Sequence, residues 1–373
     1  MKNILIVEDD KAILRGLGEN FEREGYRVWL ESDGSKGYAA ARLEQPDLVI
    51  LDVMLPSMTG FEICSRLKGE GFGSPIFLLT GLSEERSRLE GLGHGADDYI
   101  SKPFSIRELT LRVQNALKQH EQVQARSKTL EEEFQKARKI QLSSLPKGSL
   151  KTRGLELFGK TLPATQVGGD YFDYLRMGKG KIGVVVADVS GKGMPAALYV
   201  QKMQGIVQSS KKTASSAGDI LSALQEHLPS SMEATSFVTA VAAVFDLANF
   251  SVEIAQAGHL PVLLKRKRTI RLIKPPGVWI GKSSQDLFKN GLQPETLKLQ
   301  SGDQFLFYTD GVLEATNRRG EEYGLPRLKK TLLALKGTMK ETTIRCLDDL
   351  QKFSGDRVQA DDITMLSALA TKY

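Results

Sequence analysis

The sequence contains few of the residues that build disulfide frameworks and zinc sites. Its 373 residues include two cysteines and four histidines. Cys64 and Cys346 lie far outside the short spacings of a cysteine-based metal site. We therefore expect both to be packing residues of a protein in a reducing compartment.

Long apolar runs are also missing. No stretch approaches eighteen consecutive apolar residues, so the sequence predicts no transmembrane helix and no membrane partner. The first apolar run, residues 4–7, ends at Glu8 and is too short for the core of a secretion signal. These absences predict a cytoplasmic protein.

Positive charge is concentrated in the later part of the chain. Residues 1–120 contain 15 basic and 19 acidic residues, whereas residues 151–373 contain 30 and 22. The basic residues are scattered and match no known nucleic-acid-binding helix, so we expect no nucleic-acid partner. Only residues 265–268 form a dense basic run, which is either a solvated hairpin tip or a docking patch for an acidic protein surface.

The length and the changes of pattern predict more than one domain. We expect a first domain at residues 1–120, a helical linker at 121–150 and a second domain at 151–373. In the first domain, short apolar runs alternate with helical periodicity, which predicts a doubly wound α/β fold with a five-stranded parallel sheet. The expected strands are residues 4–7, 28–30, 48–51, 76–79 and 98–100.

Charged and hydroxyl side chains follow these strands at the end of the sheet where ligands bind. Glu8 and Asp9 follow the first strand, and Asp52 ends the third. Three convergent carboxylates need a cation, and their oxygens suit Mg²⁺. Asp52 could then accept a phosphoryl group as an aspartyl phosphate, whose oxygens Lys102 and Thr80 would hold.

Several segments of this domain resemble the motifs of bacterial response-regulator receiver domains, which have a flavodoxin-like fold. The segments are residues 4–10, 52–56, 78–81 and 96–104. The resemblance implies that Asp52 is the phosphoacceptor, that Glu8 and Asp9 bind Mg²⁺ with it, and that Thr80 and Tyr99 are switch residues. It also implies a cognate sensor histidine kinase as a partner. The alternative is a receiver-shaped domain that is never phosphorylated.

The composition around the linker predicts one long helix, because residues 105–145 contain no glycine or proline. The segment has two heptad seams, of which one is apolar and the other contains both apolar and polar residues. This pattern favours a weak coiled coil and a homodimer through residues 105–145. The alternative is a single helix that packs on its own domains. The seams are Leu109, Ala116, Val123, Leu130 and Ala137, and Val113, His120, Ser127, Phe134 and Gln141.

Strand patterns follow one another in the second domain and helices are grouped, which predicts an antiparallel α+β layered fold. The expected strands are residues 155–162, 171–175, 182–187, 238–245, 252–257, 262–264 and 304–308, and the expected helices are residues 196–209, 217–228, 325–335 and 341–353.

Aspartates adjoin glycines or strand ends at four places in this domain. They are Asp170, Asp188, Asp310 and the pair Asp361 and Asp362. Such a set without cysteine favours Mg²⁺ or Mn²⁺ over zinc. Two ions that share a carboxylate could activate water and clamp a phosphoryl group.

In order along the chain, five segments resemble the motifs of metal-dependent protein phosphatases, especially their bacterial sporulation and stress-response branch. They are residues 168–173, 188–198, 257–261, 307–315 and 361–364. The resemblance implies an αββα sandwich and hydrolysis of phosphoserine or phosphothreonine on a protein without a covalent intermediate. It also implies that the substrate is an anti-sigma-factor antagonist.

The same resemblance assigns metal ligands residue by residue. Asp170 and Asp188 would bind one ion with the Val189 carbonyl, and Asp188 would bridge to a second ion. Asp310 and Asp361 would bind the second ion, although Asp362 remains an alternative to Asp361.

Several local patterns have other interpretations. Gly191-Lys192-Gly193 lacks the spacing and the hydroxyl residue of a nucleotide P-loop. Residues 168–172 differ by one residue from a diguanylate cyclase signature, but a cyclase would leave the other aspartates unexplained. We expect His259, Thr309 and Ser190 to stabilise turns. A different class of function, a binding adaptor that keeps a phosphatase fold, remains possible for this domain order.

Overall fold

The computed structural model describes residues 1–81, 95–178 and 180–371. The chain divides into two compact units, Met1–Glu131 and Glu132–Tyr373. The predicted long helix is confirmed as α5 (Ile106–Ser144), which contributes residues to both units. Among the described helices, none combines the length and the apolar character needed to cross a membrane.

The first unit contains a parallel sheet of five strands, as predicted, and their order is β2-β1-β3-β4-β5. Its elements before α5 are β1 (Asn3–Val7), α1 (Lys11–Arg23), β2 (Arg27–Glu31), α2 (Gly34–Glu44), β3 (Leu48–Asp52), α3 (Gly60–Gly69), β4 (Ile76–Gly81) and β5 (Asp98–Lys102).

Helices cover both faces of this sheet. Alternate residues of each strand point to opposite faces, so one strand contributes side chains to two apolar clusters. Ile4 and Ile6 of β1 share one apolar cluster with Leu17 of α1 and with the start of α5. Leu5 and Val7 belong to a second cluster with buried residues of α2 and α3. The doubly wound fold is therefore confirmed.

The second unit contains two antiparallel sheets, with the orders β15-β11-β10-β9-β8 and β13-β12-β16-β17-β7-β6, and β14 pairs with β10. Its strands are β6 (Leu150–Thr152), β7 (Leu155–Leu162), β8 (Asp170–Gly178), β9 (Lys181–Val189), β10 (Phe237–Asp246), β11 (Ser251–Ala257), β12 (Val262–Arg266), β13 (Thr269–Ile273), β14 (Ile280–Gly281), β15 (Glu295–Lys298), β16 (Gln304–Tyr308) and β17 (Ile363–Ala370). Its other helices are α6 (Met194–Ser210), α7 (Ala217–His227), the 3-10 turn Pro229–Ser231, α8 (Gln285–Gly291), α9 (Gly311–Glu314), α10 (Gly324–Ala334) and α11 (Met339–Ser354).

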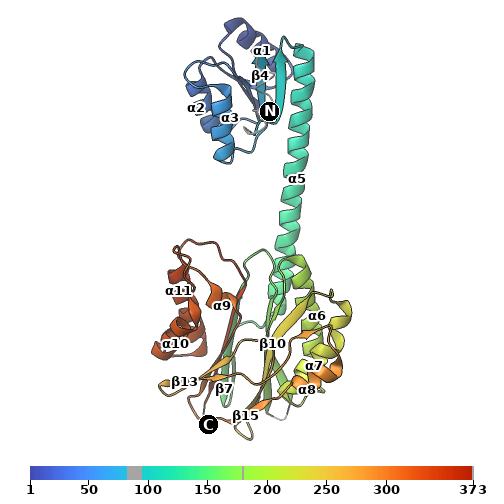
Figure 1. Cartoon of the computed structure of the whole chain (residues 1–373), viewed down its shortest axis with the longest axis vertical. Coiled ribbons are helices and arrows are strands. Elements are labelled where there is room, and N and C mark those ends of the chain that lie inside the picture. The colour runs from blue at the N-terminus through green and yellow to red at the C-terminus, as the bar shows by residue number, and fades with distance from the viewer. Residues whose placement is uncertain (82–94, 179, 372–373) are drawn as a thin grey trace. The chain divides into compact units, whose positions relative to one another are not determined.

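The two sheets pack face to face, with helices on their outer sides (Figure 1). Between the sheets, Phe245 of β10 meets Phe305 of β16 edge to face, with ring centroids 5.4 Å apart. Helices α6 and α7 share the large apolar cluster that includes β9 and β10, whereas α10 and α11 pack on β16 and β17. This arrangement confirms the predicted αββα sandwich.

The strand β17 was not expected, although it lies between β16 and β7. Its eight residues are almost all buried and form a short, nearly continuous apolar run. Periodicity alone cannot assign such a run to a strand or a helix. The interpretation of residues 361–364 as a ligand motif therefore missed the strand that follows it.

The basic run at residues 265–268 forms a hairpin between β12 and β13, but it is only partly a solvated tip. Lys265 is buried, and its ammonium group donates hydrogen bonds to the Leu332 and Leu335 carbonyls at 2.9 and 2.6 Å. Arg266 pairs with Asp303 at 2.7 Å. Half of the run therefore stabilises the fold and is not a free docking patch.

Both cysteines are buried, as expected, and burial raises the pKa of Cys64 to about 11 and that of Cys346 to about 12. The thiolate is the reactive form of cysteine. We therefore predict that neither thiol of the folded protein reacts with Ellman's reagent at pH 8, and that both react after unfolding in guanidinium chloride. Reaction of one thiol in the folded protein would contradict this packing.

Candidate functional site

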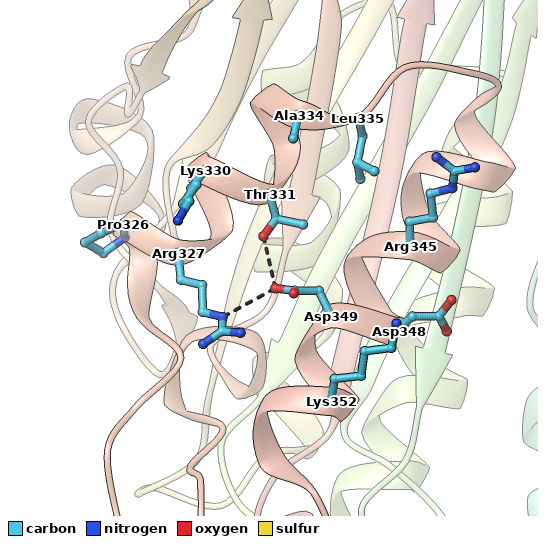
Figure 2. A pocket seen from close by; sticks show the side chains of 10 residues that line it. All are labelled: Pro326, Arg327, Lys330, Thr331, Ala334, Leu335, Arg345, Asp348, Asp349 and Lys352. Carbon is cyan, nitrogen blue, oxygen red and sulfur yellow. Dashed lines mark hydrogen bonds and ion pairs between the residues drawn. The ribbon is translucent and has the colours of Figure 1, made fainter.

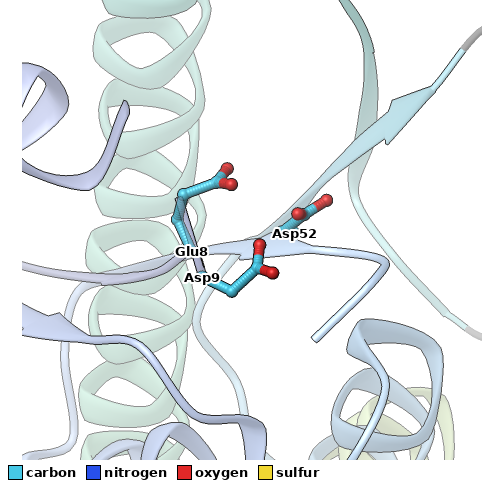
Figure 3. Close-up of side chains that lie close together, drawn as sticks. All are labelled: Glu8, Asp9 and Asp52. Atoms are coloured by element: carbon cyan, nitrogen blue, oxygen red, sulfur yellow. The ribbon is translucent and has the colours of Figure 1, made fainter. Parts of the chain in front are cut away.

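The acidic residues of the first unit converge at the carboxyl end of its sheet. Strands β1 and β3 are neighbours, and Val7 lies opposite Leu51, so Glu8, Asp9 and Asp52 come together (Figure 3). One carboxylate oxygen from each lies within 4.8 Å of the other two. In residues 1–81, 95–178 and 180–371, no other group of three potential ligands is this compact. Oxygen ligands at this spacing suit Mg²⁺.

Lys102 at the end of β5 neutralises part of this negative charge. Its ammonium nitrogen lies 2.7 Å from Glu8 and 3.0 Å from Asp52. Burial raises the pKa of Glu8 despite this contact, and repulsion from Asp52 adds to the effect. Burial alone would lower the pKa of Lys102, but the hydrogen bonds to both carboxylates raise it overall. The ammonium group thus stays charged.

The two expected switch residues lie on the neighbouring strands β4 and β5. Thr80 is buried and lies one residue beyond the partner of Asp52 in the sheet. Tyr99 is half-buried on β5, and burial raises the pKa of its phenol.

Gly60 begins α3, where a β-carbon would lie 2.3 Å from the Asp52 carbonyl oxygen. Only glycine lets the chain approach Asp52 this closely.

The aspartates of the second unit come from both sheets. Asp170 begins β8 and lies opposite Asp188 of β9. Asp310 follows β16 and Asp361 precedes β17, and these two strands are paired in the other sheet. The sandwich therefore brings together four carboxylates from chain segments up to 191 residues apart.

Crowding among these carboxylates disfavours their ionised forms. Burial, followed by repulsion from Asp310 and Asp361, raises the pKa of Asp188 to about 8. Burial and Asp188 raise the pKa of Asp170 well above its usual range. Burial and Asp361 also raise the pKa of Asp310. Such a donor set is suited to multivalent cations, which remove the repulsion and favour the carboxylates.

Asp361 and Asp362 have different surroundings. Both oxygens of Asp362 accept backbone N–H groups, from Ala164 at 2.7 Å and from Gly169 at 2.6 Å. A β-carbon on Gly168 would lie 2.7 Å from one of these oxygens. Asp361 is more exposed and lies 3.0 Å from the Lys192 ammonium group. Asp362 therefore holds the loop before Asp170, whereas Asp361 makes no such backbone contact with the described residues of that loop and lies near enough to Asp188 and Asp310 to raise the pKa of both.

Thr309 has a larger role than the turn residue that the sequence suggested. It is buried, and its hydroxyl donates to Asp170 at 2.8 Å and accepts the Thr364 N–H at 3.0 Å. The threonine thus connects carboxylate-bearing segments of both sheets. The Ser190 hydroxyl accepts the Phe237 N–H at 2.8 Å and so connects the end of β9 to the start of β10 rather than closing a local turn.

His259 also connects the sheets. Its Nε2 lies 3.1 Å from the Tyr308 carbonyl, which requires Nε2 to donate, and its Nδ1 then accepts from the Thr239 hydroxyl at 2.8 Å. Thr239 lies opposite Asp188 in the sheet. Burial lowers the pKa of His259 to about 4, so this side chain is neutral and structural near pH 7.

A glutamine of α5 reaches the same region within the second unit. Gln141 is buried, and its amide accepts the Gly168 N–H at 3.1 Å and donates to the Gly168 carbonyl at 2.7 Å. Gly168 lies two residues before Asp170. The sequence placed Gln141 on a weak helix seam and gave no signal for this contact, because it forms only after the helix packs.

The largest cavity described, about 900 Å³, lies between α10 and α11 and contains none of the predicted site residues (Figure 2). Its acidic residue Asp349 is engaged by Thr331 at 3.0 Å and by Arg327 at 3.4 Å. The size of a cavity therefore does not identify where the candidate functional residues of this unit lie.

We predict that Thr309→Val weakens Mn²⁺ binding to the second unit by roughly 10–100-fold, because Asp170 loses its orienting hydrogen bond. Isothermal titration calorimetry measures the change. Thr309→Ser keeps the hydroxyl and serves as the matched control, with binding near that of the wild type. Unchanged Mn²⁺ affinity in the valine variant would contradict the orienting role.

Sequence profiles match both units. The profile of stage II sporulation protein E (SpoIIE) matches residues 178–370, and that of the response regulator receiver domain matches residues 4–114. Among curated relatives, the alkaline phosphatase synthesis transcriptional regulatory protein PhoP of Bacillus subtilis is 45% identical over 120 residues, which are 32% of this chain and 50% of PhoP. The probable transcriptional regulatory protein TcrX of Mycobacterium tuberculosis is 40% identical over 115 residues, 31% of this chain and 49% of TcrX. The chain spans about half the length of these curated relatives.

Solved structures share the fold of the second unit. The SiaA-PP2C domain of Pseudomonas aeruginosa has a TM-score of 0.59 at 21% identity, covering 66% of this chain and 99% of that one. The PP2C phosphatase domain of SpoIIE from Bacillus subtilis has a TM-score of 0.52 at 16% identity, covering 59% and 64%. With its family profile and its fold in agreement, the chain belongs to the SpoIIE family of PP2C-type phosphatase domains and carries a response regulator receiver domain ahead of it.

Proposed function

We propose that this protein is a two-component response regulator whose receiver controls a metal-dependent serine/threonine protein phosphatase. One observation supports the enzyme most directly. Asp170, Asp188, Asp310 and Asp361 converge from two sheets, and burial together with repulsion among these carboxylates raises the pKa of Asp170, Asp188 and Asp310. Few functions other than binding multivalent cations account for carboxylates brought together so that their ionised forms are disfavoured.

Two Mn²⁺ or Mg²⁺ ions would occupy this set. We assign Asp170, Asp188 and the Val189 carbonyl to one ion, and Asp188, Asp310 and Asp361 to the other. The Val189 carbonyl oxygen lies 3.2 Å from the position that a β-carbon on Gly169 would occupy, and is therefore close to the residue that precedes Asp170. We exclude Asp362 from the ligands because backbone N–H groups already engage both of its oxygens.

When bound, the ions would activate water and neutralise the phosphoryl group of a phosphoserine or phosphothreonine protein. The chain's own residues orient this site. Thr309 and Asp362 hold the segments that bear Asp170, and His259 fixes the distance between the two sheets. The Lys192 side chain is 54% exposed, and its ammonium group beside Asp361 can attract a dianionic phosphoryl group.

In the receiver, Glu8, Asp9 and Asp52 would bind Mg²⁺, and Asp52 would accept a phosphoryl group from a cognate sensor histidine kinase. Lys102 lies where it can hold a phosphate oxygen, 3.0 Å from Asp52. Thr80 and Tyr99 would respond to the new charge. The resemblance to sporulation and stress-response phosphatases favours a phosphorylated anti-sigma-factor antagonist as the substrate.

We further propose a homodimer through residues 105–145. Val123 and Leu130 lie one heptad apart on α5 and are 67% and 46% exposed. Apolar side chains at heptad spacing on an exposed helix suit a coiled-coil seam. Leu109 and Val113, earlier on the seams, are instead buried against the receiver sheet.

The enzyme proposal predicts that the purified chain releases phosphate from a phosphoserine protein when Mn²⁺ is present. Asp188→Asn removes the shared ligand and should reduce the rate by at least about a thousandfold, comparable to the loss of a key catalytic group. A malachite green assay measures the phosphate. A wild-type protein that is inactive with Mn²⁺ but binds a partner tightly would support the adaptor hypothesis.

The contact of Gln141 with Gly168 offers a route from the linker to the metal ligands. Gln141→Leu removes both hydrogen bonds and leaves buried backbone groups unpaired, at a cost of about 1–3 kcal/mol. We predict that this substitution changes the rate of Mn²⁺-dependent phosphate release by roughly tenfold. It should also make that rate less responsive to acetyl phosphate.

Gln124→Leu is the matched control, because Gln124 is exposed on α5 and its side chain pairs with His120 of the same helix at 2.7 Å. Asp52→Asn should abolish the response to acetyl phosphate. A Gln141→Leu variant with wild-type activity and a wild-type response would exclude this route.

A further inference from the structure

A cavity of about 340 Å³ lies beside the metal-ligand cluster of the second unit. It is formed by α9, the end of α11 and the segment that leads from α11 to β17. Asp361 and Gly311, which follows Asp310, belong to its wall. The cavity is therefore continuous with the carboxylate cluster, unlike the larger cavity between α10 and α11.

The floor of this cavity is apolar. Leu347 and Leu350 of α11 and Ile363 of β17 are 6%, 3% and 6% exposed and belong to the apolar cluster beneath α10 and α11. Leu162 and Ala315 are half-buried beside them. A floor of this composition favours an apolar group over water or a charged one.

Polar contacts hold the walls in place. The Gln359 side chain donates to the carbonyls of Leu162 and Asp361, both at 2.7 Å. Arg357 donates to the Asn317 carbonyl at 3.1 Å. These bonds connect the segment after α11 to both sides of the cavity, so the cavity is preformed. In contrast, Val358 on its lining is 87% exposed, which leaves an apolar side chain unpaired at the rim.

We propose that this cavity is a specificity pocket that binds an apolar side chain of the phosphoprotein substrate, close in sequence to the phosphorylated residue. The inference rests on the proposed phosphatase function. A residue one to three positions from the phosphoserine of an extended segment lies about 3–10 Å from it along the chain. With the phosphoryl group at Asp361 and Lys192, such a residue can reach the adjoining cavity.

The charges around the cavity agree with this occupant. Lys192 attracts the phosphoryl group at one side of Asp361. Glu314 and Arg357 place one charge of each sign on the cavity wall, so the wall offers no net attraction to an acidic side chain and the apolar floor is the stronger feature. An apolar neighbour of the phosphoserine therefore fits better than an acidic one.

The experiment scans phosphoserine peptides in which each position from three before to three after the phosphoserine is leucine, alanine or aspartate. The full chain is assayed with Mn²⁺, and p-nitrophenyl phosphate serves as a substrate without flanking residues. We expect kcat/KM to favour leucine over alanine by about tenfold at one position, as for an apolar pocket. Hydrolysis of the small ester without preference at any position would overturn the pocket.

Two variants connect a preference to the cavity. Val358→Asp adds charge at the exposed rim, and Ala315→Leu fills the space. Each should reduce the leucine preference at least about fivefold and leave turnover of p-nitrophenyl phosphate unchanged. Leu287→Asp is the matched control, because Leu287 is 57% exposed on α8, outside the cavity lining, and should keep the preference.

The possible failures are distinguishable. A wild-type chain that hydrolyses neither the small ester nor any peptide contradicts the proposed phosphatase itself. A wild-type preference that both Val358→Asp and Ala315→Leu leave unchanged places the specificity elsewhere and overturns this inference alone.

Discussion

Asp362 accepts backbone N–H groups from Ala164 and Gly169, and the rest of the second site depends on these two hydrogen bonds. They join the start of β17 in one sheet to the loop before β8 in the other. Four carboxylates that repel one another would otherwise move apart. Because Asp362 approaches so closely that Gly168 has no room for a β-carbon, glycine at position 168 is a steric requirement of the site.

The two units solve the same electrostatic problem in different ways. In the receiver, Lys102 supplies a permanent positive charge to a small cluster whose members follow neighbouring parallel strands. In the second unit, the carboxylates are more numerous but, apart from Asp170, only half-buried, and the exposed Lys192 side chain is a cation at their edge. The first arrangement suits one ion and a carboxylate that accepts a phosphoryl group, whereas the second suits more than one ion.

Side chains other than the aspartates also connect the segments of the second cluster. Thr309 and His259 contribute no carboxylate, but each contacts groups from both sheets. Gln141 adds a contact from α5 to the segment before Asp170. A change in the packing of α5 can therefore reach the ligand segment through direct hydrogen bonds, without a change in the ligands themselves.

The sequence by itself determined the fold classes, the long helix and the positions of the aspartates, because strand and helix periodicity and the glycine-aspartate motifs are local patterns. It also determined the clustering of Glu8, Asp9 and Asp52, since the carboxyl ends of parallel strands share one edge. Only the tertiary structure showed that Asp361 and Asp362 have different partners, and it revealed the contacts of Thr309 and Gln141. These depend on side chains from segments distant in the chain, and the buried strand β17 has no periodicity that distinguishes it from a helix.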